Sequence, residues 1–236
     1  MLSLARCRLA AMTELFPSEA RAFWKALLDN ASALLSDAAV LLEIGSFGRA
    51  RALNVLAQEE LGKALWIYDA FSESWSAGDS TPRSVGAMAR HGRDHVRKYL
   101  EATRFGEELG PFWGDYSALD IRREGESWEH ARQRRQSELD ASAGAANTTK
   151  QRGFYVDRCA DGTVRSPTTV SSSGVAEELR VSAQVVEVLL IQDHSRMKFE
   201  AVTEYDGTQT QQLRLLSISH PEDWAEATGE FRNPPR

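Results

Sequence analysis

Residues 89–100 read ARHGRDHVRKYL and contain the best candidates for chemistry in the chain. A histidine imidazole both takes and gives a proton near neutral pH, so His95 suits a general acid or base. Arginine presents a planar fork of donors that matches phosphate oxygens, so Arg90 suits a phosphate group. Metal-independent RNA cleavage needs these functions: a base for the 2′-hydroxyl, an acid for the leaving 5′ oxygen, and a cation for the phosphorane.

Helical geometry limits how these two residues can cooperate. At about 100° per residue, Arg90 and His95 point roughly 140° apart on a regular helix. They meet on one phosphate only if the helix starts after Arg90, which Gly92 favours, or if a second subunit supplies the arginine. The alternative is a solvated stripe of Arg90, Arg93 and Arg97. A regular helix through Arg90, with apolar side chains around His95, would exclude the nuclease hypothesis.

The same stretch offers little to a metal ion. His91 and His95 stand four residues apart, the spacing that two metal-binding histidines use on a helix. No glutamate follows His91, and His130 and His194 are far away in the sequence. We therefore predict no metal and no other cofactor.

A polar network is predicted on the helix that contains QEELGKA (58–64). Glu60 falls close to an apolar stripe, where an unpaired carboxylate is costly. Arg49 lies about three turns earlier on nearly the same side, and we group it with Glu60 and Lys63. Glu59 and Lys63 have the i,i+4 spacing of an ordinary surface pair. The predicted supporting residues of the site are Arg49, Glu60, Lys63, Asp94 and Tyr99.

Basic residues also suggest contact with RNA. Between Arg83 and Arg104, six Lys or Arg residues face two acidic ones, although a solvated helix face gives the same tally. The segment KQRGFYVD (150–157) combines basic and aromatic residues, which suit single-stranded RNA, and an edge hairpin packed on the bundle is the alternative. The predicted RNA-binding residues are Arg93, Arg97, Lys98, Arg152 and Tyr155.

Apolar residues at three- and four-residue steps predict the helices that position these side chains. Ser18 is the expected cap of a first helix of roughly 25 residues, and Ser46 the expected cap of a second helix over 47–75. Their short connection makes them antiparallel neighbours. A linker at 76–84 precedes a third helix that reaches Leu109, and a fourth helix spans 174–201.

The remaining segments are expected to be less regular. We interpret 111–149 as a charged insertion with one exposed helix near 126–140. Residues 150–167 are predicted to form a hairpin, because Asp161-Gly162 between β-type residues is typical of a type I′ turn. A single domain then spans 18–205, with a poorly ordered N-terminus at 1–17, where Met12 is an alternative start. A polar, loosely ordered tail is expected at 206–236.

The composition is that of a globular protein of 236 residues, with 42% hydrophobic and 26% charged residues. The net charge of −6 means that any contact with a polyanion must come from a local patch. Two cysteines without a CxxC pair favour reduced thiols, and arginines interrupt the first apolar run, so we expect a cytoplasmic protein without a membrane span.

Three blocks of the sequence resemble the abortive infection protein V (AbiV) family, which belongs to the HEPN superfamily of helical domains. The first is GSFGRARAL leading into QEELGKA, the second is the histidine of RDHVRKYL, and the third is KQRGFYVD ahead of a turn, a proline and a long helix. Together they cover about residues 24–200 in the family's order. The long charged region at 111–149 departs from the family pattern.

The resemblance implies an all-α fold, a HEPN-like four-helix bundle that is usually a homodimer. It implies a bacterial anti-phage toxin that acts when infection is sensed. The superfamily's nuclease signature is an arginine, four to six residues, and a histidine, which Arg90 and His95 match. The implied partners are a second copy of the chain, an RNA substrate, and a phage-encoded activator.

Two functions remain open from the sequence. The first is a metal-independent endoribonuclease that halts translation or growth. The second is a non-catalytic HEPN module that blocks a phage protein or a translation component, which the acidic net charge and the awkward phase of Arg90 and His95 favour. A nucleotide-binding or assembly domain without toxicity is a third possibility, because fold does not fix function.

Overall fold

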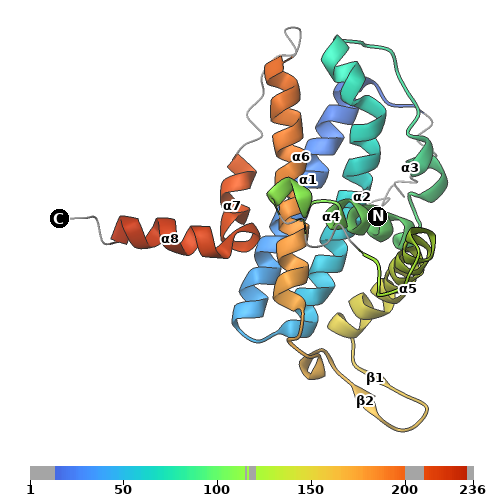
Figure 1. The fold of residues 1–236 in the computed structure, drawn as a ribbon, viewed down its shortest axis with the longest axis vertical. Helices are drawn as coiled ribbons and strands as arrows, with labels where there is room; N and C mark the ends of the chain where they lie inside the picture. The colour runs from blue at the N-terminus through green and yellow to red at the C-terminus, as the bar shows by residue number, and fades with distance from the viewer. Residues whose placement is uncertain (1–13, 115, 117–120, 200–209, 233–236) are drawn as a thin grey trace, which may run out of the picture.

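The computed structural model describes residues 14–114, 116, 121–199 and 210–232 (Figure 1). The predicted all-α class is confirmed, since the described strands are only two residues long. Most of the segment 1–17, predicted to be poorly ordered, lies outside the described residues. In chain order the elements are α1 Pro17–Glu43, α2 Phe47–Ala77, α3 Gly86–His91, α4 His95–Glu107, η1 Pro111–Trp113, α5 Trp128–Phe154, β1 Asp157–Arg158, β2 Val164–Arg165, η2 Pro167–Thr169, α6 Val175–Phe199, α7 Thr210–Ser219 and α8 Pro221–Arg232.

The first two helices form the antiparallel pair that the sequence predicts. Trp24 of α1 and Phe71 of α2 are fully buried, and Trp24 packs against the rings of Tyr68 and Trp75. The indole Nε1 of Trp75, at the end of α2, donates to the carbonyl of Pro17 at the start of α1 (2.8 Å). This bond satisfies a buried donor and joins the end of α2 to the start of α1, as expected for an antiparallel pair.

Of the two predicted N-caps, Ser18 is wrong and Ser46 is correct in position. Helix α1 begins at Pro17, which suits the first helical position, so Ser18 lies inside the first turn. The backbone N–H of Phe16, the N-cap residue, donates to Glu19 (3.0 Å). Ser46 is the N-cap residue of α2, but its side chain makes no capping hydrogen bond.

Helix α2 lies at the centre of the fold and contacts α1, α4, α5 and α6. Its buried residues therefore surround most of its circumference instead of forming one stripe. Helix α6 is tied to α1 by a two-pronged ion pair, in which Arg21 donates to both oxygens of the fully buried Asp193 (2.8 and 2.7 Å). Arg196 also pairs with Asp193 (2.8 Å), so this buried carboxylate is satisfied from two sides.

The predicted third helix is two helices. Helix α3 ends at His91, and α4 begins at His95 after a short turn. The carboxylate of Asp94 accepts from the backbone N–H of Arg97 (3.1 Å), which is the usual geometry of an N-cap. Because Asp94 is an N-cap, a new helix begins at His95. The prediction of one third helix is therefore wrong.

The segment 111–149 is also different from the predicted exposed insertion. Most of it belongs to α5, a 27-residue helix that packs against α2 and α4. The buried face of α5 consists mainly of small residues, whose weak hydrophobic signal hid the periodicity. They are Ala131, Leu139, Ala143, Ala146 and Gly153. Residues 150–154, predicted to be part of the hairpin, form the last turn of this helix.

A hairpin does follow, but it is shorter and has a different turn. Asp157 pairs with Arg165 and Arg158 with Val164 in antiparallel register. The N–H of Gly162 donates to the carbonyl of Cys159 (3.0 Å). Gly162 has positive φ but Asp161 does not, so the turn is not type I′. This pattern is typical of the three-residue hairpin loop.

The expected loose tail contains ordered helices. Helix α7 contacts α6 and α1, and its Leu215 is buried. The side-chain amide of Gln184 in α6 donates to the carbonyl of Ser219 (3.1 Å), which joins the end of α7 to the bundle. Among the described helices, none has the length and apolar character needed to cross a membrane.

The contact between α2 and α5 gives a test of the packing. A Cβ on Gly153 would overlap the carbonyl of Gly48, whereas a Cβ on Gly144, on the same helix, would meet open space. We expect Gly153→Ala to lower the free energy of unfolding by about 1–3 kcal/mol. Gly144→Ala should leave it unchanged or raise it by up to about 1 kcal/mol. Urea unfolding of both variants checks this, and equal stability of the two would contradict the packing.

Candidate active site

A buried carboxylate joins three helices at one point. Glu59 of α2 has a side chain that is only 6% exposed. Nδ1 of His95, the first residue of α4, donates to its Oε2 (2.6 Å), and Nζ of Lys150 in the last turn of α5 donates to its Oε1 (2.6 Å). Nζ of Lys98, one turn into α4, lies 3.5 Å from Oε2. One anion is thus surrounded by three basic side chains.

A close helix crossing brings these groups together. A Cβ on Gly62 would overlap the backbone carbonyl of Lys98, so only glycine lets α4 approach α2 at this point. Gly62 lies three residues after Glu59 and therefore on the adjacent turn of the same side of α2. The first turn of α4 is consequently held against α2, with His95 and Lys98 beside the carboxylate.

The electrostatics of Glu59 determine the tautomer of the histidine. Burial is the largest single effect and raises the pKa of the Glu59 carboxyl, but the hydrogen bonds and positive charges of Lys150 and His95 together hold the pKa below its ordinary value of 4.5. An ionised carboxylate only accepts hydrogen bonds, so Nδ1 of His95 must bear a proton. Lys150 Nζ, 3.4 Å from the same Nδ1, therefore cannot donate to it.

This tautomer leaves the other ring nitrogen for chemistry. In the neutral imidazole, Nε2 then has the lone pair that can take a proton. The side chain of His95 is 52% exposed, so a substrate can reach it. A histidine oriented by a buried carboxylate, with an accessible Nε2, is the arrangement that general-base catalysis uses.

Arg90 lies on the other side of the α3–α4 turn. It occupies the last turn of α3 and is exposed, and its guanidinium lies beside Gly86 within its own helix. The helix is thus broken between Arg90 and His95, and His95 is not enclosed by apolar side chains. The condition that would have excluded the nuclease hypothesis is not met. Arg93 and Arg97 are exposed on either side of His95 in the sequence.

The predicted network of Arg49, Glu60 and Lys63 is correct for Glu60 and Lys63 and wrong for Arg49. Glu60 and Lys63 form an ion pair with each other (2.6 Å) and are partly exposed. Arg49 is exposed and donates to the hydroxyl of Ser46 (3.4 Å), far from Glu60 along α2. Glu59, which the sequence assigned to a surface pair, is the buried member. The two neighbouring glutamates point about 100° apart, and α4 and α5 cover the side of Glu59.

The other predicted residues have separate positions. Asp94 caps α4 and does not contact His95, and Tyr99 packs against the small cluster of Leu100, Leu139 and Ala143. Lys98 is buried, so its side chain faces Glu59 and not solvent.

Arg152 and Tyr155 are both exposed, but on the end of α5 and not on a strand. The sequence reasoning missed Glu59 and Lys150 as partners of His95. The only signal for Glu59 was its place in QEELGKA, and nothing in the sequence showed that the end of α5 returns to α2.

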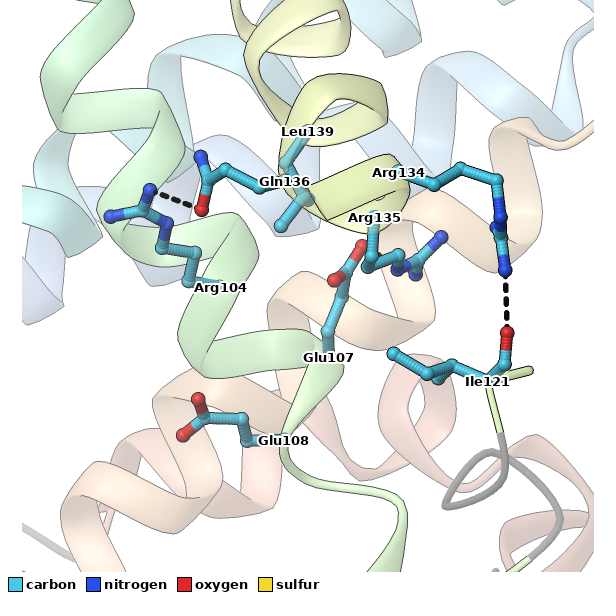
Figure 2. A pocket seen from close by; sticks show the side chains of 8 residues that line it. All are labelled: Arg104, Glu107, Glu108, Ile121, Arg134, Arg135, Gln136 and Leu139. Carbon is cyan, nitrogen blue, oxygen red and sulfur yellow. Dashed lines mark hydrogen bonds and ion pairs between the residues drawn. The ribbon is translucent and has the colours of Figure 1, made fainter. Parts of the chain in front are cut away.

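A cavity of about 550 Å³ lies between α4 and α5 (Figure 2). Most of its charged side chains have partners within the protein. Arg134 pairs with Glu126 (3.0 Å) and donates to the carbonyl of Ile121, and Arg135 pairs with Glu107 (2.6 Å). These contacts attach the start of α5 and the preceding segment to the bundle. No group of three or more His, Cys, Asp or Glu suited to a metal ion occurs within the part of the chain that the structure describes.

The helices and this site define the class of protein. The HEPN_AbiV family model, described as AbiV, matches residues 19–187, from α1 well into α6. The match covers more than half of the chain, so the domain is a HEPN domain. The chain belongs to the AbiV family, as the sequence resemblance predicts. No curated protein and no solved structure matches it.

The buried carboxylate makes stability depend on pH in a defined way. The pKa of Glu59 is lower in the folded chain than in the unfolded chain, so the carboxylate contributes stability that is complete above pH 4.5 and is lost as the pH falls through the lowered value. At pH 7, Glu59→Gln should lower the free energy of unfolding by about 2–4 kcal/mol, because Lys98 and Lys150 lose their counter-charge. This deficit should shrink below pH 4.5.

The matched control is the neighbouring residue. Glu60→Gln breaks a partly exposed pair and should cost less than about 1 kcal/mol at any pH. Thermal or urea unfolding of the two variants between neutral and acidic pH measures both effects. An equal, pH-independent loss in both variants would contradict the assignment of Glu59.

Proposed function

We propose that this AbiV-family protein is a metal-independent endoribonuclease of abortive infection, whose activity halts translation or growth in an infected bacterium. The observation that supports it most is the hydrogen bond between His95 Nδ1 and the buried Glu59, which leaves the Nε2 lone pair of the neutral ring free on a half-exposed side chain. Many HEPN domains act on RNA and many form dimers, and the family match therefore supports the same substrate class.

In the proposed reaction, the His95 Nε2 takes the proton of a ribose 2′-hydroxyl. The 2′ oxygen attacks the adjacent phosphorus, and the bond from phosphorus to the 5′ oxygen breaks. The imidazolium then returns its proton to the departing 5′ oxygen, so the products are a 2′,3′-cyclic phosphate and a 5′-hydroxyl. The ionised Glu59 stabilises the imidazolium in between, as the aspartate does in a Ser-His-Asp triad.

The phosphorane charge needs a cation near His95. Arg90, Arg93 and Arg97 are exposed on the α3–α4 turn and the first turn of α4. An arginine fork binds two phosphate oxygens at once, which no buried lysine in this site can do. We assign this role to Arg90, which the superfamily signature selects, with Arg93 and Arg97 holding neighbouring phosphates.

One observation favours the non-catalytic alternative. The Arg90 guanidinium lies against Gly86, on the α3 side of the turn, and does not contact His95. A HEPN module that blocks a phage or translation component would need no convergence of the two. The nuclease proposal instead requires Arg90 to swing toward His95 when RNA binds, or to act on the His95 of a second copy.

Substitution of His95 tests the nuclease proposal directly. Purified His95→Ala should lose at least about 100-fold in RNA cleavage, since general acid–base catalysis contributes about 10²–10⁴. The assay uses total RNA in EDTA, with cleavage products resolved on a gel. His91→Ala, four residues earlier on α3, is the control and should keep its activity. Full cleavage by folded His95→Ala would overturn the proposal, and intact RNA with arrested in vitro translation would favour the blocking module.

Arg90 and the second copy can be tested together. Arg90→Gln alone should reduce cleavage at least about 100-fold, because a donor to the transition-state charge is lost, whereas Arg49→Gln should not. If the arginine acts across a dimer, mixing Arg90→Gln with His95→Ala restores part of the activity in mixed dimers. Gel assays of single and mixed proteins measure this, and full activity of Arg90→Gln would exclude Arg90 from the site.

A further inference from the structure

A second, smaller cavity of about 280 Å³ lies where α2 begins, α5 ends and η2 packs against both. Three arginines from three different elements line it: Arg51 of α2, Arg152 of α5 and Arg165 of β2. The remaining lining residues are small or bear hydroxyl groups. They are Gly48, Thr149, Ser166, Thr169 and Val170. No carboxylate is part of this lining.

The arginine charges are only partly used. Arg51 donates to Glu178 (3.0 Å) and to the carbonyl of Ser173, which fixes its guanidinium at the wall. Arg152 and Arg165 form no ion pair with any residue in the described part of the chain. The charge of Arg165 does contribute to lowering the pKa of Asp161. In a chain with a net charge of −6, this concentration of positive charge is local and strong.

The walls of this arginine pocket are set by backbone contacts. A Cβ on Gly48 would overlap the carbonyl of Pro167 in η2, and Gly153 of α5 packs on Gly48 from the other side. The backbones of α2, α5 and η2 are therefore in close contact, which fixes their relative positions. Arginine forks and hydroxyl groups are the donors that bind phosphate oxygens, and the lining contains no aromatic ring on which a base would stack.

We propose that the arginine pocket is a phosphate-binding subsite, which takes a phosphodiester of an RNA strand or the phosphate of a free nucleotide. Use by RNA rests on the proposed nuclease function. Helix α5 connects the two places, because Lys150 contacts Glu59 while Thr149 and Arg152 line the pocket. Arg51 lies eight residues before Glu59, or about 12 Å along α2, so one strand can lie over His95 and place another phosphate in the pocket.

The test compares two double variants of the full chain, each in a His95→Ala background that prevents cleavage. Arg152→Gln with Arg165→Gln removes two pocket charges. Arg132→Gln with Arg158→Gln removes two charges from the same helix and the same hairpin, outside the pocket. Fluorescence anisotropy with a labelled single-stranded RNA measures the first source of phosphate. The shift in Tm caused by AMP measures the second, because a ligand of the folded state stabilises it.

We expect the pocket variant to bind RNA at least about tenfold more weakly than the control variant, with a salt dependence reduced by about one to two phosphate contacts. Weaker RNA binding without an AMP effect identifies a strand phosphate. Loss of an AMP-induced Tm shift with unchanged RNA binding identifies a free nucleotide. Equal RNA affinity of the two variants, together with equal Tm shifts or no Tm shift caused by AMP, overturns the proposal. Circular dichroism confirms that both variants are folded.

This result is independent of the cleavage assay. If His95→Ala retained RNA cleavage, the proposed active site would fail while phosphate binding in the pocket could still be measured. If the pocket variant responded to both RNA and AMP as the control variant does while His95 proved essential, only the subsite would be wrong.

Discussion

The structure depends on how one buried negative charge is satisfied. An ionised carboxylate in the interior is tolerated only with partners that replace its water, and Glu59 obtains them from two other helices. Its position thus requires α4 and α5 to lie against α2 with a definite register. Gly62 allows α4 to approach α2 closely, and the small residues of α5 allow α5 to do the same. The imidazole orientation follows from the same constraint, since His95 is one of the groups that the carboxylate needs.

The functional group is therefore a product of tertiary structure and not of one helix. His95 lies at the first position of α4 because Asp94 starts the helix there. Its Nδ1 proton is held by a residue 36 positions away, and the pair is flanked by Lys150 from the far end of α5. A motif that names only an arginine and a histidine omits the carboxylate that orients the imidazole.

The sequence predicted the elements whose apolar signal is strong. The antiparallel pair α1–α2, the late helix α6 and the hairpin before it follow from regular spacing of large residues and from turn residues. A helix near 126–140 was predicted, but the full length of α5 and its buried face were missed, because Ala143, Ala146 and Gly153 bury little apolar area while allowing close backbone contact. At the site, His95 was identified by its chemistry, but the choice of Glu60 over Glu59 depended on which side of α2 other helices would cover. Long-range packing decides that, and periodicity within one helix does not.

Positive charge is concentrated locally, although the chain has a net charge of −6. Around Glu59 the bases outnumber the single carboxylate, and exposed arginines flank His95, so the surface there is positive although the chain is not. The pocket between Arg51, Arg152 and Arg165 extends this positive region along α2 and α5. Elsewhere Arg134 and Arg135 of the α4–α5 cavity are neutralised by Glu107, Glu126 and Glu138. A local positive region on an acidic protein attracts a polyanion at that region, which favours one binding orientation before any specific contact forms.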